Sequence, residues 1–174
     1  MRTGHVNPES MQEAYDFHRL VLETAPFHLT ISPLDVDYLE LLFGFDLECK
    51  GNQDEVVFEA LFGHSPLANL SRIKQASFLD TQPVFGFQLD QKGQTQAYFE
   101  VKTRAKNRRG SSGRSRDEPL SIFLTVRRYG PVQEIDQLQS IFEDLAQKAE
   151  NLASDRLVPD LLQPIARQIT SSNA

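Results

Sequence analysis

The chain has 174 residues, the length of one ordinary domain, and a domain of this size buries about 70% of the surface that its unfolded form exposes. Its 40% hydrophobic and 24% charged residues are typical of globular proteins and exclude a disordered or fibrous chain. The formal net charge is −6 at pH 7.

No apolar run approaches the ~20 residues that a membrane-spanning helix needs. The N-terminus has no apolar stretch of the kind that a secretory signal requires. The single cysteine, Cys49, has no partner within the chain for a disulfide. We therefore expect one cytoplasmic domain over residues 1–174, without a membrane span.

An N-terminal helix is expected over residues 8–25. The sequence Asn-Pro-Glu at positions 7–9 supplies a cap, a proline at the first helical position and an acid in the first turn. Apolar residues then recur every three or four positions until Pro26, which predicts the end of the helix. Alternating apolar residues over 27–31 predict a short strand.

A long strand is expected from Leu39 to Cys49, because every odd position is apolar and several even positions are acidic. Cys49 is then a small core residue, and Gly44 predicts a bend or a bulge. Asn52, with Glu55 three residues later, has the form of a capping box. It predicts a short helix that Gly63 ends.

The segment 64–81 is compatible with a short helix opened by Ser65-Pro66 or with an irregular crossover. Beyond it, period-two patterns predict three strands in an antiparallel meander, with a hairpin loop over 90–94. The first two expected strands are 85–89 and 97–103. The third begins at Leu120 and ends at Tyr129-Gly130-Pro131.

An amphipathic helix is expected over 132–152. A last helical segment begins at Ser154, where Pro159 and Pro164 predict a kink or a break. Residues 170–174 are expected to fray. The order α-β-β-α-β-β-β-α-α predicts an α+β fold whose sheet has about five mainly antiparallel strands and carries helices on one face.

The charge is unevenly distributed along the chain. Nine of the 18 basic residues lie between Lys102 and Arg128, which leaves nine basic against 22 acidic residues elsewhere. Most of the nine fall in a flexible hairpin excursion over 105–118, and the adjoining strands extend the basic surface. The candidate partner-binding residues are Lys102, Arg104, Arg108, Arg109, Arg114, Arg116 and Arg127. Tyr98 and Phe123 are candidates for stacking on bases, because their alternation places them on the outward strand faces.

No motif for catalysis, a metal or a cofactor stands out in the sequence. It contains no Gly-x-Ser-x-Gly turn, no His-Glu-x-x-His pair and no phosphate-binding glycine loop. The sequence therefore favours a non-enzymatic interaction or adaptor domain that contacts an acidic partner through the basic hairpin. Such a domain is expected to form a homodimer, through a sheet edge or through the amphipathic C-terminal helix.

Two alternatives remain open at this point. The first is a nucleic-acid-associated protein, in which the arginines bind phosphates and Tyr98 or Phe123 stacks on bases. The second is a small-ligand-binding protein or an enzyme, with a pocket under the sheet built from residues that are distant in the sequence. The hairpin is equally consistent with a solvated linker.

Overall fold

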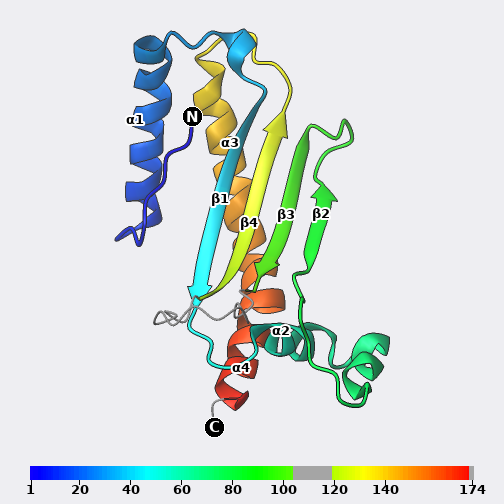
Figure 1. Ribbon diagram of the computed structural model, residues 1–174. Coiled ribbons are helices and arrows are strands. Elements are labelled where there is room, and N and C mark those ends of the chain that lie inside the picture. The colour runs from blue at the N-terminus through cyan, green and yellow to red at the C-terminus, as the bar shows by residue number, and fades with distance from the viewer. Residues whose placement is uncertain (104–118, 173–174) are drawn as a thin grey trace, which may run out of the picture. The chain divides into compact units, whose positions relative to one another are not determined.

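The structure is a computed structural model that describes residues 1–103 and 119–172. Its strands form an antiparallel four-stranded sheet in the order β1-β4-β3-β2, and together with the helices they make an α+β fold (Figure 1). The fold class is confirmed, with four strands in place of about five. No helix of the described residues is long and apolar enough to cross a membrane. The strands are β1 (Tyr38–Leu47), β2 (Val84–Gln88), β3 (Thr95–Lys102) and β4 (Leu120–Tyr129).

The chain divides into two compact units. The boundaries fall within all four strands and within a long helix, so each of these elements contributes residues to both units. Each unit has its own buried apolar residues, such as Tyr15 and Phe142 in unit 1 and Val57 and Ile165 in unit 2. Unit 1 comprises residues 1–41, 88–96 and 126–148, and unit 2 comprises 42–87, 97–125 and 149–174.

The first helix, α1 (Met11–Leu29), begins three residues later than expected. Its N-cap is Ser10, whose hydroxyl accepts the N–H of Glu13 at 3.2 Å, while the Glu13 carboxylate accepts the N–H of Glu9 at 2.9 Å. Asn7, the expected cap, instead adopts a left-handed conformation with φ of 51°. The cap pattern Ser-x-x-Glu therefore starts the helix.

The same helix passes through Pro26, so the strand expected over 27–31 is wrong. A proline lacks its own N–H, but its carbonyl still accepts hydrogen bonds, and near a helix end few bonds are lost. Here the Pro26 carbonyl accepts the N–H of Ile31 at 2.9 Å, and Thr30 ends the helix with a left-handed φ of 55°. The alternation of apolar residues that suggested a strand belongs to the last helical turn.

Strand β1 confirms the predicted alternation, with its odd positions turned inward and its even positions exposed or half-buried. Its outward side chains lie opposite those of β4 in one register, and the register is the same on both sides of Gly44. A bulge would insert a residue and shift the pairing, so the bulge expected at Gly44 is wrong. The facing pairs are Tyr38 with Tyr129, Glu40 with Arg127, Gly44 with Phe123 and Asp46 with Ser121.

Helix α2 (Gln53–Phe62) in unit 2 starts and stops as predicted. The side-chain oxygen of Asn52 accepts the N–H of Glu55 at 3.4 Å and so caps the first turn. Gly63 follows the last turn, where a Cβ would lie 2.6 Å from the Glu59 carbonyl oxygen. Only glycine fits that close approach without a shift of the backbone.

The segment after α2 contains the 3₁₀ helix η2 (Pro66–Arg72), which resolves the choice left open for residues 64–81. Ser65 caps this helix by accepting the N–H of Leu67 at 3.2 Å. Farther along, the Phe78 ring stacks on Phe58 of α2 with centroids 4.4 Å apart. The segment is thus held to α2 before β2 begins.

The C-terminal helices α3 (Gln137–Leu152), η3 (Ala153–Leu162) and α4 (Gln163–Ser172) follow one another without a break. Segment η3 is a π-helix, in which the N–H of Gln163 bonds to the Val158 carbonyl five residues back. A proline ring collides with the carbonyl four residues back in an α-helix. The wider π-helical register around Pro159 avoids this collision, so the helix continues through Pro159. Of the kink or break expected there, the break is therefore wrong.

The end of α4 also differs from the expected frayed tail. Residues 170–172 are helical, and the Thr170 hydroxyl donates to the Ala166 carbonyl at 2.9 Å. Residues 173–174 lie outside the described part of the chain. The apolar stripe of these helices is buried, as predicted, through Leu138, Ile141, Phe142, Leu145, Leu157, Leu161, Ile165 and Ile169.

Candidate functional site

The predicted basic patch divides between residues inside and outside the described chain. Arg104, Arg108, Arg109, Arg114 and Arg116, with the hairpin 105–118, lie outside it. Lys102 at the end of β3 is described: its Nζ is 3.2 Å from the Glu100 carboxylate and 5.4 Å from the centroid of the Phe123 ring. Its side chain is 48% exposed, so the ammonium group can also reach an external anion.

Arg127 of β4, in unit 1, is held by its neighbours. Its guanidinium donates to the Glu40 carboxylate and, at 2.7 Å, to the Tyr129 hydroxyl. It also lies over the ring of Tyr38, 4.6 Å from the centroid. Partial burial opposes the charged form, but the hydrogen bonds to Tyr129 and Glu40 outweigh it and raise the pKa of Arg127. This geometry ties β1 to β4, a role that the sequence pattern did not indicate.

Tyr98 and Phe123, the candidate stacking residues, both lie over glycines of neighbouring strands in unit 2. A Cβ added to Gly86 would be 3.0 Å from the Tyr98 ring, and one added to Gly44 would be 3.1 Å from the Phe123 ring. An aromatic ring that covers a glycine on the next strand replaces the contacts that the missing side chain would make. Both rings therefore have a structural partner within the sheet.

Asp54 is a buried carboxylate, 4% exposed, that sequence reasoning missed. It accepts the Thr103 hydroxyl and, at 2.8 Å, the backbone N–H of Thr81. It thereby links the first turn of α2 to the end of β3 and to the segment before β2. The hydrogen bonds that surround it fit an anchor of the fold rather than a catalytic acid.

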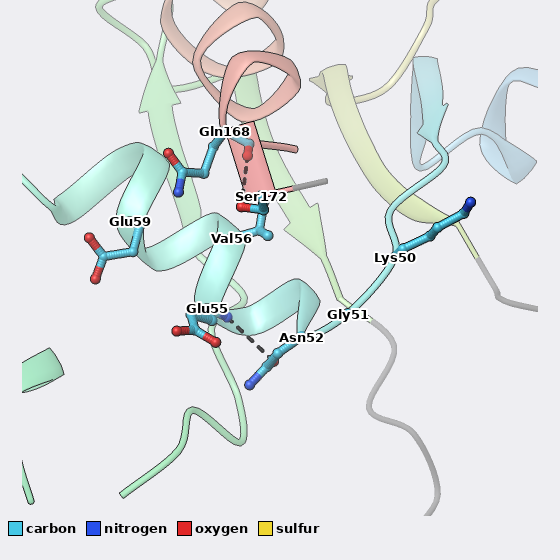
Figure 2. Close-up of a pocket in the computed structure, with 8 residues that line it drawn as sticks. All are labelled: Lys50, Gly51, Asn52, Glu55, Val56, Glu59, Gln168 and Ser172. Atoms are coloured by element: carbon cyan, nitrogen blue, oxygen red, sulfur yellow. Dashed lines mark hydrogen bonds between the residues drawn. The ribbon is translucent and has the colours of Figure 1, made fainter. Parts of the chain in front are cut away.

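A cavity of about 290 Å³ lies where α2 packs against α4 in unit 2 (Figure 2). Two of its polar groups have partners, since Asn52 caps α2 and the Ser172 hydroxyl donates to the Gln168 carbonyl at 2.8 Å. Within the described ranges, no three His, Cys, Asp or Glu side chains converge to hold a metal ion. The lining residues are Lys50, Gly51, Asn52, Glu55, Val56, Glu59, Gln168 and Ser172.

Strand β2 is a second feature that sequence reasoning underestimated. It stands at the end of the sheet order (Figure 1). Every one of its five residues is exposed. Val84, Phe85 and Phe87 are 39% to 55% exposed. Edge position, which the pattern does not reveal, leaves them uncovered.

Helix α1 carries a second apolar stripe, consisting of Phe17, Leu20 and Phe27. At 100° per residue these positions lie opposite the face that buries Ala14 and Tyr15. The three side chains are 41% to 76% exposed. The buried face packs on α3 within unit 1, where the Tyr15 and Phe142 rings meet edge to face with centroids 5.6 Å apart.

Comparison with known proteins finds no matching family model, no matching curated protein and no matching solved structure.

Proposed function

We propose that the chain is an interaction domain without an enzymatic activity of its own, which recruits a protein partner. The observation that carries this proposal is the α1 stripe. A helix that already buries one apolar face gains nothing from a second exposed one unless another molecule covers it. Exposed large apolar side chains in a row on one helix face are the usual contact points of helix-mediated recognition.

The surroundings of the stripe indicate the chemistry of the partner. Glu13, Asp16 and Glu23 are exposed on α1 beside it. A partner with an apolar helix face bordered by lysine or arginine would complement both features. The segment 105–118 is basic, in contrast to the acidic residues of α1, and would bind an acidic part of a partner surface. We further propose that the chain associates with a second copy of itself as a homodimer.

The test is a pull-down from native cell extract with matched variants. One variant carries Phe17→Ser, Leu20→Ser and Phe27→Ser, and a second replaces Arg108, Arg109, Arg114 and Arg116 with serine. The control is Leu34→Ser, which removes an apolar side chain that is 92% exposed and lies outside α1. We expect one protein to be recovered with the wild type and the control, to be lost from the α1 variant, and to bind the wild type again when purified.

Each other outcome has a defined meaning. Equal recovery with all variants would contradict the proposal for both surfaces. Loss from the arginine variant alone would place recognition in the hairpin. If nuclease treatment removes the recovered material and binding weakens steeply with salt, the nucleic-acid alternative is correct.

A further inference from the structure

We propose that β2 pairs with β2 of a second copy, antiparallel and across a two-fold axis, so that the two sheets become continuous. This inference rests on the proposed interaction role and deepens it by naming one partner and the surface that binds it. It depends on three features of β2: its free backbone groups, its uncharged side chains and its self-complementary sequence.

The backbone register shows which groups of β2 are free. The N–H of Leu89 donates to the Thr95 carbonyl at 2.8 Å, and the N–H of Val101 donates to the Pro83 carbonyl at 3.0 Å. In an antiparallel pair the hydrogen-bonded residues alternate, so the odd residues of β2 direct their backbone groups at β3. The even residues Val84, Gly86 and Gln88 therefore direct theirs at the open edge.

The side chains of β2 do not protect that edge. The sequence Val-Phe-Gly-Phe-Gln contains no charge and no proline. In natural edge strands, lysines, prolines or bulges usually prevent pairing with other chains. Pro83 precedes the strand, but its odd position turns its missing N–H toward β3. Among the described residues no strand pairs with this edge, so its donors and acceptors are available there.

The sequence of β2 is complementary to itself when Gly86 lies on the two-fold axis. Gly86 then faces Gly86 of the second copy and Val84 faces Gln88, all in hydrogen-bonded positions. Phe85 faces Phe87 in the closely spaced, non-hydrogen-bonded position, on the sheet face where Phe87 already meets Phe99 with ring centroids 5.8 Å apart. Two exposed aromatic residues of each copy would thus become buried against each other.

The other surface considered for self-association, the amphipathic C-terminal helix, is already used. Its apolar residues, among them Leu145, Leu157 and Ile165, are fully buried within the chain. A five-residue strand pair buries less surface than a standard interface of about 1,600 Å². We therefore expect a reversible dimer whose population depends on concentration.

The first test is sedimentation velocity over a wide concentration range. The wild type should shift from the monomer mass of 19.7 kDa toward twice that value. Phe87→Lys places a charge in the interface, and Val84→Pro removes an N–H that faces the open edge, not β3. Both variants should stay monomeric with wild-type circular dichroism. Leu34→Lys, a control at a side chain that is 92% exposed and lies outside both α1 and β2, should dimerise like the wild type.

The second test examines the register through disulfide formation in a Cys49→Ser background. Facing hydrogen-bonded residues have Cα atoms about 5.5 Å apart, a distance that a disulfide can bridge. A mixture of Val84→Cys and Gln88→Cys chains should therefore form a mixed disulfide dimer. Either variant alone would place its cysteines ~14 Å apart and should crosslink far less.

A wild type that stays monomeric at the highest concentration overturns the inference. So does a dimer that both Phe87→Lys and Val84→Pro leave intact, or crosslinking that does not prefer the mixed pair. The proposed recruitment function is tested separately, because its variants lie on α1 and in the basic hairpin. A monomeric wild type that still recovers a partner would refute the β2 pairing alone.

Discussion

The two edge strands of the sheet, β1 and β2, differ in how their residues protect them against pairing with another chain. Strand β1 has charged residues, Glu40 and Asp46, on its outward face, where each accepts a hydrogen bond from a β4 side chain. The Phe123 ring of β4 covers Gly44 of β1. Strand β2 is half as long, uncharged and exposed at every residue. Charges discourage a foreign strand from pairing, so β1 is less suited than the uncharged β2 to pair with another chain.

The strands also differ in what holds them. Strand β1 is stabilised by cross-strand side-chain pairs, the usual unit of sheet stability. Strand β2 contacts β3 through Tyr98 over Gly86 and through Phe87 and Phe99. It is also held by the β2–β3 turn, where the Asp90 carboxylate accepts the N–H groups of Lys92 at 2.8 Å and Gln94 at 3.1 Å. Variants at each edge should therefore loosen that edge and spare the other.

The largest effect is expected from Phe123→Ala. It uncovers Gly44 and removes the ring that lies beside Lys102. We expect the free energy of unfolding to fall by about 2 kcal/mol, below the range for fully buried phenylalanines because this ring is half-buried. Urea unfolding measures this loss, and hydrogen exchange should show faster exchange of β1 amides.

The control for this prediction is Phe123→Leu, which keeps an apolar cover over Gly44 and should lose less stability. The amides of β2 should exchange at the wild-type rate in both variants. If Phe123→Ala speeds exchange in β2 as much as in β1, the two edges are not held independently and the comparison fails.

A smaller effect is expected from Arg127→Ala, which removes the hydrogen bonds to Glu40 and Tyr129 and the contact with Tyr38. Exposure to solvent weakens such pairs, so we expect a loss of roughly 1 to 2 kcal/mol. Arg127→Lys keeps the charge without the planar fork and should lose an intermediate amount. A double-mutant cycle with Glu40→Gln measures the interaction free energy between Arg127 and Glu40. Strictly additive effects would show that the two residues do not interact.

The smallest effect is expected at the β2–β3 turn. Hydrogen bonds from the Thr95 hydroxyl and from the N–H groups of Thr95, Gln94 and Lys92 lower the pKa of Asp90 to about 2, from an ordinary value of 3.8. A depressed carboxyl pKa contributes stability above the unfolded value, and this contribution is lost as the pH falls through the folded value. The β2–β3 hairpin should therefore loosen between about pH 4 and pH 2.

This pH dependence is measurable by following the hairpin amides in NMR spectra during an acid titration. Asp90→Asn should abolish the acid transition of the β2–β3 hairpin. Asp136→Asn, which changes a residue outside this hairpin, should preserve it. A transition that persists in Asp90→Asn would assign the pH dependence to another group. The amides of β1 serve as an internal reference in each titration.

Local chemistry made part of the molecule predictable from the sequence. The alternation of β1, the capping by Asn52 and the stop at Gly63 are confirmed, because each depends on neighbours a few residues apart. The β2–β3–β4 meander is confirmed as well, since strands that follow one another in the chain are usually neighbours in a sheet. The strand expected over 27–31 was wrong because alternation over so few residues does not distinguish a strand from a helical turn. Of the candidate site residues, sequence alternation correctly placed Tyr98, Lys102, Phe123 and Arg127 on the outward strand faces, but not their partners.

The sequence by itself determined the α+β class, the helices that bury one face and the concentration of positive charge between Lys102 and Arg128. Only the tertiary structure decided which strand is an uncovered edge, because strand order depends on contacts between residues far apart in the chain. It likewise decided that Tyr98 and Phe123 cover glycines, since cross-strand pairs exist only after the register is set. The open edge at β2 follows from strand order, which no local pattern encodes.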